Sequence, residues 1–570
     1  MLPKNDQGVT VEFNEYWDYP KIEQWVRDFA AENASWVSVE ILTTTQLGQS
    51  IFLLTLGENS SDTPAMWIDA GTHAAEWTGV MALIYTLEKW ADFAREPHGK
   101  KWFQENTIFA VPCICPDGYQ ALIDGEAFLR STLRPPKRGV FRQGLEPQDI
   151  DGDGRILFMR WRDPAGPYII DDEADFGLRK RKLDDDPADA CFLSQEGMFI
   201  EWDGVKWTQA SLKYGLDLNR NFPINWSPFE MFGMDSGEYP LSEPESRVVM
   251  EAVVARPNIA VALTNHTYTG AILTQPYNVD TPLSELDIDL MEAMATQAVR
   301  GTDYQVYRVA PDFTYDPKQP IIGVWADCLT TTLGIPAYTL ELWNPFSWAG
   351  VQVKKPAEFF KRPSPHIVDA LLRKALQDSQ LMLWRPHQHP QLGTVEIGGF
   401  DYFRTIRNPP EALLEKECQK GFLVADNMRK TLPKLKVALN AEPLAFGLYR
   451  ITAFFENQGY LSTTSLERAR DIRQSKELWV SLAPEEGIEI IEGQKHQVLD
   501  ALDGWGTLQI RSAKNIIYPA LPARGHRDSV SWTVKGRGVV EILWDAGKAG
   551  KGKKSLQINS DPESNQLKLW

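Results

Sequence analysis

Residues 67–77 constrain the fold of this chain more than any other stretch. The apolar run that begins at Trp67 predicts a strand, and the small residues after it predict a turn. Beyond the turn, the spacing of Val80, Leu83, Ile84 and Leu87 places apolar side chains on one face of a helix. A strand that leads directly into an amphipathic helix is typical of α/β proteins, whose functional groups gather at the carboxyl ends of strands.

Further strands and helices alternate along the first three-quarters of the chain. Strands are predicted at 107–111, 259–265 and 335–343, with helices at 22–29 and 243–255. The run at 259–265 is almost continuously apolar, as expected where both faces of a sheet are covered. We therefore expect an α/β fold with a mixed, largely parallel twisted sheet flanked by helices.

Composition changes divide the chain into parts. We predict a catalytic domain over residues 1–432, with an insertion at about 127–215 that is rich in charge, Gly and Pro and poor in periodicity. Helices at about 356–380 and 409–430 are expected to pack on the back of this domain. Residues 433–570 show repeated short strands with turns between them, which predicts an antiparallel β-sandwich as an accessory domain. Within it, the lysine-rich run at 548–554 is expected to be a solvated hairpin tip.

Charge and cysteine content exclude several classes of protein. The 570 residues include 77 acidic and 59 basic side chains, and this net charge of -18 argues against a nucleic-acid partner. Five cysteines do not form the pattern of a disulfide framework. No apolar stretch is long enough to span a bilayer and the first residues do not resemble a signal peptide, so we expect a cytoplasmic protein, or an exported one if a signal has been removed.

Residues that could bind a metal or transfer a proton lie in or directly after three of the predicted strands. His73 and Glu76 stand three residues apart in the first turn, His266 ends the strand at 259–265, and Glu341 lies inside an otherwise apolar strand. A lone His at a strand end is usually structural, and a lone buried acid usually pairs with a base. Two imidazoles and a carboxylate, however, are the ligand set of zinc sites that keep a position open for catalysis.

The order of these motifs, with Asn219-Arg220 between them and an Arg cluster upstream, resembles the zinc metallocarboxypeptidases of the carboxypeptidase A type. The resemblance covers roughly residues 12–430, and the residues around 448–461 resemble the segment after the catalytic domain in some bacterial members. It implies a Zn²⁺ site formed by His73, Glu76 and His266, with Glu341 as the general base that activates a metal-bound water.

The resemblance also assigns substrate-binding residues. Asn219 and Arg220 match the pair that holds the C-terminal carboxylate of the substrate, and Arg134 matches the residue that polarises the scissile carbonyl. Arg130 and Arg138 compete with Arg134 for that role. Direct counting places no tyrosine at the family's active-site position, and Tyr315 is the nearest substitute.

Other positions bear on specificity. The family often has Arg in the middle of the first motif, where this chain has Ala75, so the substrate contacts are expected to differ. Ala326 and Asp327 lie near the position at which the family sets side-chain preference. An Asp327 that faced the pocket would favour basic residues, and otherwise it is structural.

A second metal site is suggested within the insertion. Asp149, Asp151 and Asp153, with Gly154 after them, match the start of a calcium-binding loop, although Arg160 takes the place of the usual glutamate. The alternatives are a Ca²⁺ site and a solvated acidic turn.

Three functions remain open on the sequence alone. The first is a zinc exopeptidase that hydrolyses the C-terminal peptide bond of peptides or proteins, so that its partner is a peptide or protein C-terminus. The second is hydrolysis of a peptidoglycan stem peptide or another amide at the same site. The third is a non-catalytic peptide-binding protein, against which the presence of Glu341 argues because binding alone needs no general base.

Overall fold

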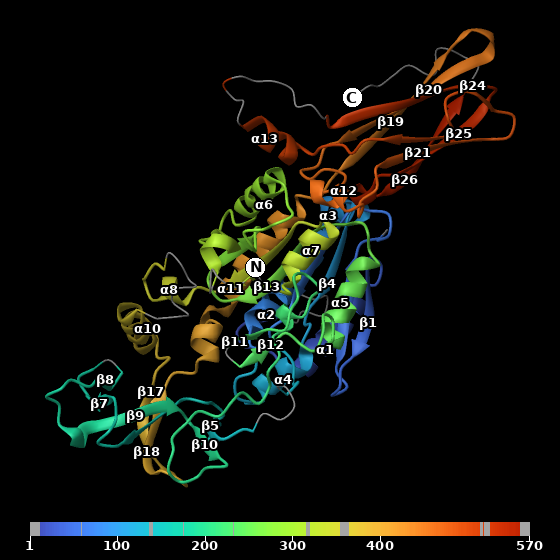
Figure 1. Ribbon diagram of the computed structural model, residues 1–570. Coiled ribbons are helices and arrows are strands. Elements are labelled where there is room, and N and C mark those ends of the chain that lie inside the picture. Colours follow the sequence, from blue (N-terminus) through green and yellow to red (C-terminus); the bar gives the residue numbers. More distant parts are fainter. Residues whose placement is uncertain are drawn as a thin grey trace.

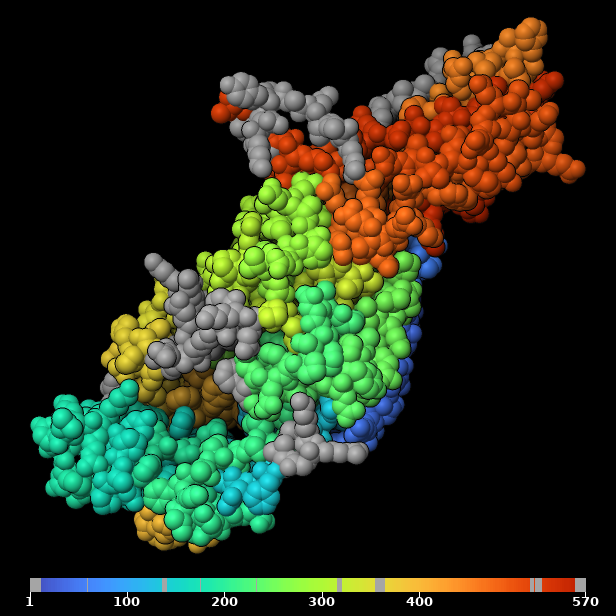
Figure 2. Space-filling model, viewed as in Figure 1, coloured from blue at the N-terminus to red at the C-terminus, as the bar shows by residue number. Residues whose placement is uncertain are grey.

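The computed structural model describes residues 12–58, 60–135, 141–174, 176–231, 233–314, 320–353, 364–513, 517 and 525–558. These residues form a central α/β domain with a small β-lobe at one end and a β-sandwich at the other (Figure 1). The lobe and the sandwich project from opposite ends of the central domain in the space-filling view (Figure 2).

An eight-stranded mixed sheet is the centre of the molecule. Its strand order is β1-β2-β4-β3-β13-β16-β14-β15, and the four middle strands run parallel. The strands are β1 (Val37–Thr44), β2 (Ser50–Leu56), β3 (Ala65–Ala70), β4 (Thr107–Val111), β13 (Ile259–Thr267), β14 (Ala271–Thr274), β15 (Gln305–Arg308) and β16 (Ala337–Leu342). The predicted fold class, including the mixed and largely parallel sheet, is confirmed.

Helices cover both faces of this sheet. One core cluster joins the sheet to α1, α2, α6 and α11, and a second joins its other face to α5 and α7. The helices around the sheet are α1 (Tyr19–Glu32), α2 (Trp77–Arg95), α3 (Pro97–Glu105), α4 (Pro116–Ile123), α5 (Pro244–Val254), α6 (Glu285–Ala298), α7 (Trp325–Leu333) and α11 (Glu411–Arg429). Alternate residues of β2 enter opposite clusters, which explains why the inner strands are apolar throughout.

The insertion folds as a separate β-lobe. A six-stranded sheet, β17-β18-β6-β9-β7-β8, combines strands of the insertion with two strands from much later in the chain, and β5 pairs with β10 beside it. These strands are β5 (Gly144–Pro147), β6 (Phe158–Arg162), β7 (Tyr168–Ile170), β8 (Leu178–Lys180), β9 (Ala190–Gln195), β10 (Gly197–Ile200), β17 (Met382–His389) and β18 (Gly393–Gly399). Met159, Trp161, Val395 and Ile397 form its small core. The strands of the insertion are short and carry little periodicity, and one of them, β6, pairs with β18 from more than two hundred residues away.

One predicted helix has a different place. α10 (Pro365–Gln377) packs beside α8 (Pro345–Trp348) and not on the back of the main sheet, whereas α11 does pack there against α2 and α6. A small cluster of Trp343, Phe346 and Leu371 buries the apolar side of α10. Residues 356–363 of the predicted 356–380 helix lie outside the described residues.

The C-terminal region contains two four-stranded antiparallel sheets, β19-β20-β24-β22 and β23-β21-β25-β26. A shared core, which includes Phe455, Val480, Trp532 and Ile542, lies between them, so this region is the expected β-sandwich. The strands are β19 (Leu435–Pro443), β20 (Leu448–Asn457), β21 (Leu478–Pro484), β22 (Glu489–Glu492), β23 (His496–Leu499), β24 (Arg527–Lys535), β25 (Gly538–Asp545) and β26 (Lys551–Ile558).

The lysine-rich run is not a solvated hairpin tip. Lys548 is only 2% exposed, and its Nζ donates a hydrogen bond to the carbonyl of Ile259 at 2.8 Å. The remaining lysines of the run, from Lys551, begin β26. The run therefore joins the sandwich to the first residue of β13, because one lysine folds inward while the others line an edge strand.

None of the described helices is long and apolar enough to cross a membrane. All five cysteines are buried and free of disulfide bonds.

Candidate metal centre and active site

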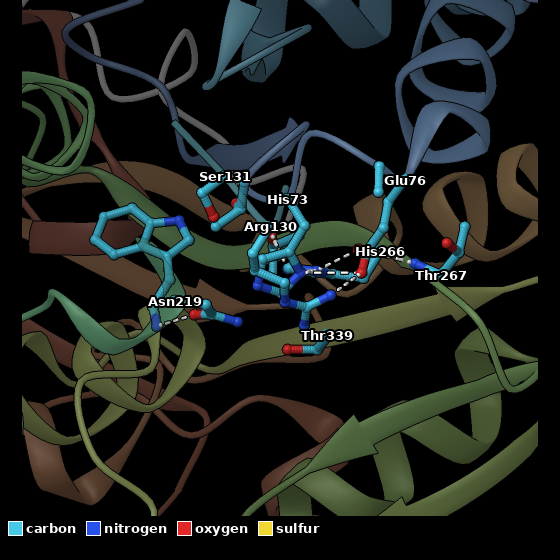
Figure 3. Close-up of polar contacts among 12 residues, drawn as sticks. His73, Glu76, Arg130, Ser131, Asn219, His266, Thr267 and Thr339 are labelled. Atoms are coloured by element: carbon cyan, nitrogen blue, oxygen red, sulfur yellow. Dashed lines mark hydrogen bonds and ion pairs between the residues drawn. The ribbon is translucent and has the colours of Figure 1, made fainter. Parts of the chain in front are cut away.

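Three side chains converge where the central parallel strands end. His73 and Glu76 lie in the turn between β3 and α2, and His266 lies near the end of β13, which pairs with β3 along its length. His73 Nδ1 is 3.0 Å from Glu76 Oε1, and His266 Nδ1 is 2.8 Å from Glu76 Oε2. The two Nδ1 atoms are 3.0 Å apart (Figure 3). The sequence-predicted ligand set is therefore brought together, although the ligands come from segments almost two hundred residues apart.

The geometry of this cluster suits zinc. Ligands bound tetrahedrally at about 2.0–2.1 Å lie about 3.3 Å from one another, close to the separations found here. Both Nδ1 atoms face the Glu76 carboxylate and each other, so that, without protons on either Nδ1, all three side chains direct lone pairs to one point. All three side chains are buried, with exposed fractions of 4% or less. The donor set, two imidazoles and one carboxylate, is the one that leaves a coordination position open.

Neighbouring groups orient both imidazoles. Asp217 Oδ1 is 3.2 Å from Nε2 of His73, and Thr264 Oγ1 is 3.3 Å from Nε2 of His266. Such outer partners fix the ring that a metal-binding histidine presents. Asp217 was not predicted from the sequence, although it stands two residues before the predicted Asn219. Burial disfavours the Asp217 carboxylate, but Arg220, His73 and Arg130 outweigh burial and hold its pKa well below the usual range.

Glu341 lies beside the cluster. In the parallel pairing of β13 with β16, His266 stands opposite Glu341. The acid therefore lies next to the predicted ligand, on the neighbouring strand. Burial, and then the negative charge of Glu76, raise the pKa of Glu341 to about 7. This carboxyl group lines a cavity of about 270 Å³. A carboxylate of this basicity can take a proton near neutral pH.

The cavity combines guanidinium groups with apolar side chains. Its described lining consists of Phe128, Arg130, Asp217, Arg220, Phe229, Met231, Met234, Thr267, Tyr268, Phe313, Glu341, Tyr402 and Arg407. Phe229, Met231 and Met234 come from the hairpin of β11 (Glu230–Met231) and β12 (Met234–Asp235) or lie next to it. An apolar wall opposite charged groups is typical of a site that binds an organic ligand in one orientation.

The structure places Arg130, and not Arg134, at the site. Nη1 of Arg130 is 2.9 Å from Glu76 Oε1, and its guanidinium lies next to the histidines (Figure 3). Arg134 instead forms an ion pair with Glu243 at 2.8 Å and approaches Asp235 at 3.8 Å. Two carboxylates outside the cavity hold the side chain of Arg134, so the contacts favour Arg130 over Arg134 for the scissile carbonyl. The competing Arg138 lies outside the described residues.

Asn219 and Arg220 take different positions. Arg220 lines the cavity and lies over Phe229, with its carbon Cζ 5.8 Å from the ring centroid. Asn219 is buried, and its side-chain oxygen accepts a hydrogen bond from the backbone N–H of Trp325 at 2.8 Å (Figure 3). Arg220 Nη1 in turn donates to the carbonyl of Asn219 at 2.7 Å. Asn219 thus supports the loop that carries Arg220.

Two further cavity residues, Tyr402 and Arg407, escaped prediction. Both belong to the segment after the lobe strand β18, and no sequence motif marks either one. Tyr315 lies outside the described residues, so its predicted role stays a prediction.

Asp327 does not face the cavity. It is 3% exposed in α7, and its side chain accepts a hydrogen bond from Gln275 Nε2 at 2.8 Å. Burial raises the pKa of Asp327 to about 6. The structural alternative for Asp327 is therefore the one that the contacts support, and Ala326 beside it is fully buried.

The three aspartates of the insertion lie together, as a cation site requires. Their oxygens already accept backbone N–H groups, however. Asp149 accepts from Gly152 and Gly154 at 2.7 and 2.8 Å, and Asp153 accepts from Arg155 at 2.9 Å. These contacts are those of a hydrogen-bonded acidic turn. Calcium gains no support from them, and its binding stays a prediction.

Comparisons with known proteins agree with this geometry. A family described as zinc carboxypeptidase matches residues 22–161 and 186–353, more than half of the chain. A domain of unknown function, DUF8731, matches residues 435–557. Carboxypeptidase B of Bos taurus is 31% identical over 108 residues, which are 19% of this chain and 26% of that protein. Carboxypeptidase A2 of Mus musculus is 28% identical over 145 residues, 25% of this chain and 34% of that protein.

Solved structures give distant likenesses. The match to carboxypeptidase A from Helicoverpa armigera covers 64% of this chain and 74% of the Helicoverpa chain, at 16% identity and a TM-score of 0.40. The metallo-carboxypeptidase from Burkholderia cenocepacia covers 64% and 70%, at 15% identity and a TM-score of 0.32. The chain spans about a quarter of the length of the bovine relative. The match of the family model over more than half of its residues shows that this chain belongs to the zinc carboxypeptidase family.

Proposed function

We propose that this protein is a zinc-dependent exopeptidase that hydrolyses the C-terminal peptide bond of peptides or proteins. The observation that carries the proposal is the position of Glu341 beside the His73, Glu76 and His266 cluster, in a cavity that also contains Arg220. Side chains suited to hold a metal, to accept a proton and to bind a carboxylate thus lie close together.

Each charged residue has a separate task in this proposal. The guanidinium of Arg220 binds the terminal carboxylate, since its planar fork matches both oxygens. Arg130, next to Glu76, stabilises the negative charge that develops on the scissile carbonyl oxygen. The cluster of His73, Glu76 and His266 would hold a zinc ion, which would supply Lewis-acid activation of water at neutral pH. Glu341 would accept a proton from the attacking water and afterwards deliver it to the leaving amine.

The cavity wall indicates the preferred C-terminal residue. Phe229, Met231, Met234 and Phe313 are apolar, and Asp327 is turned away. We therefore expect an apolar or aromatic side chain at the C-terminus of the substrate, in preference to a basic one.

The test is a metal analysis followed by digestion of a peptide library and mass spectrometry. We expect about one zinc per chain and release of apolar C-terminal residues. Glu341→Gln is expected to keep its zinc and lose at least about 100-fold in kcat. Intact peptides with both metal-loaded proteins would favour the peptide-binding alternative. Cleavage only of γ-linked or other non-standard amides would favour the stem-peptide or amide hydrolase.

A further inference from the structure

A segment outside the family match supplies one wall of the cavity. Residues 401–409 follow β18 of the lobe, and the family model matches only residues up to 353. The segment contains a short π-helix, Phe403–Arg407. The guanidinium group of Arg407, the last residue of this helix, lines the cavity. The segment connects β18 of the lobe to α11 of the central domain. Tertiary contacts therefore position Arg407, and no sequence motif around it predicts that position.

Asn408 locks this segment onto the turn that carries Glu76. Its side-chain oxygen accepts hydrogen bonds from N and Oγ1 of Thr78 at 3.0 and 2.9 Å, and its Nδ2 donates to the carbonyl of Ala75 at 2.9 Å. Tyr16 adds a hydrogen bond from its hydroxyl to the carbonyl of Pro409 at 2.6 Å. Since Ala75 and Thr78 flank Glu76, the backbone of Arg407 is fixed relative to the metal ligands.

The guanidinium of Arg407 lies above an aromatic face, at the rim of the metal cluster. Its Cζ is 4.9 Å from the centroid of the Tyr268 ring. Its Nη1 is 3.4 Å from both Glu76 Oε1 and the carbonyl of Thr267, which are long contacts for a charged donor. Arg404, one turn earlier, is directed elsewhere: it pairs with Asp401 at 3.3 Å and lies over Trp77.

The charges in the cavity leave room for a second anionic group. Three guanidinium groups, those of Arg130, Arg220 and Arg407, line the cavity with the carboxylates of Asp217 and Glu341. The carboxylate of Glu76, which Arg130 and Arg407 both contact, belongs to the proposed metal site, so its charge would be taken up by the bound cation. Arg220 lies against Phe229 on the hairpin side, whereas Arg407 lies against Thr267 and Tyr268 at the end of β13. The two guanidinium groups thus reach the cavity from different elements and contact different neighbours.

From these contacts we infer that Arg407 binds a second carboxylate of the substrate, carried by the residue whose carbonyl is cleaved. The inference rests on the proposed function, in which Arg220 takes the terminal carboxylate and Arg130 stands at the scissile carbonyl. Two sources can supply this group: the side chain of Asp or Glu in an ordinary peptide, or the α-carboxylate of a residue joined through its γ-carboxyl group. A guanidinium fixed by an aromatic ring and a rigid turn binds such a group with little loss of entropy.

Binding measurements test this assignment separately from turnover. The protein is the full chain with Glu341→Gln, loaded with zinc, and the method is isothermal titration calorimetry. The probes are acetyl-Ala-Glu-Phe and acetyl-Ala-Gln-Phe, and the γ-linked acetyl-Glu-Phe peptide with its α-amide. We expect a carboxylate to tighten binding by about 10- to 100-fold over the matched neutral probe, in whichever pair fits the site.

Variants of Arg407 decide the outcome. Arg407→Met is expected to abolish the carboxylate preference and keep its zinc, and Arg407→Lys is expected to retain part of it. Arg404→Met, on the same π-helix, is the matched control and should keep the full preference. A preference that survives in Arg407→Met, or its absence in the parent protein, overturns the assignment to Arg407 alone. Failure of every probe to bind overturns the proposed function as well.

Discussion

At the scale of single residues, the site depends on groups that position the metal ligands as well as on the ligands themselves. Asp217 lies 3.2 Å from His73 Nε2, and Arg130 lies 2.9 Å from Glu76 Oε1. Asp217 was assigned no role from the sequence, and Arg130 was only one of three candidates for the scissile carbonyl, because only the folded chain shows which carboxylate and which arginine reach the cluster. Two predictions separate their tasks.

Asp217→Asn is expected to weaken zinc binding by about 10- to 100-fold, because the amide orients His73 less strongly than a carboxylate does. Competition with a chromophoric chelator measures the affinity. Asp235→Asn, which changes an acid that pairs with Arg134 instead, is the control. Equal zinc affinity of wild type and Asp217→Asn would remove the positioning role.

Arg130→Met is expected to lower kcat by about 10²- to 10³-fold while the zinc content stays the same, since the oxyanion loses its cation. Arg134→Met should change kcat little, because Glu243 and Asp235 hold Arg134 away from the cavity. Steady-state kinetics on one peptide compares both variants. The opposite pattern would indicate that Arg134 stabilises the scissile carbonyl oxygen, as the sequence had suggested.

At the scale of elements, the contact between α2 and β13 sets the distance between the metal ligands. Gly79 stands one turn after Glu76, and a Cβ added there would lie 2.9 Å from the carbonyl oxygen of Asn265, the residue before His266. The backbone of neither element has room to accept this atom. The glycine therefore permits the close approach that brings Glu76 to His266.

Gly79→Ala is expected to push α2 away from β13, to destabilise the fold by about 1–3 kcal/mol and to weaken zinc binding. Thermal unfolding with and without zinc measures both effects. A methyl group that fits would instead stabilise the helix by roughly 0.5–1 kcal/mol, since alanine is the better helix former. A rise in the melting temperature would therefore contradict the close approach of α2 to β13.

At the scale of the whole molecule, Lys548 connects the β-sandwich to the central sheet. Its side-chain nitrogen is buried and donates to the carbonyl of Ile259, and burial lowers the pKa of Lys548 to about 7. Above pH 7 the folded chain has released a proton that the unfolded chain keeps up to about pH 10.4. Because the unfolded state binds more protons in this window, the stability of the folded state rises with pH there and is lost as the pH falls toward 7.

Lys548→Met should remove this pH dependence, which amounts to at most about 1.4 kcal/mol per pH unit. We expect the variant to be more stable than wild type at pH 7 and the difference to shrink toward pH 10. Denaturant unfolding at several pH values measures it. Lys553→Met is the control, because Lys553 is exposed and pairs with Glu541. A constant difference between wild type and Lys548→Met would show that Lys548 is not buried as a neutral amine.

Much of the architecture was predictable from local pattern. Apolar runs located β3, β13 and β16, and the spacing of Val80, Leu83, Ile84 and Leu87 located α2, because periodicity reports which face of an element is buried. The lobe was not predictable, since β6 and β18 pair across more than two hundred residues and each is short. The position of α10 was predicted wrongly, because its apolar side packs against α8 and not on the back of the main sheet.

The sequence by itself identified His73, Glu76 and His266 as candidate zinc ligands and Glu341 as a candidate base, through the order of the motifs and their resemblance to the zinc carboxypeptidases. The parallel pairing of β3, β13 and β16 places these residues at one edge of the sheet. The tertiary structure alone decided which arginines reach the site. An arginine side chain is long and every copy has the same chemistry, so its role depends on the carboxylates around it. An ion pair with Glu243 keeps Arg134 outside the cavity, whereas the hydrogen bonds of Asn408 to the turn around Glu76 position Arg407 in the cavity wall.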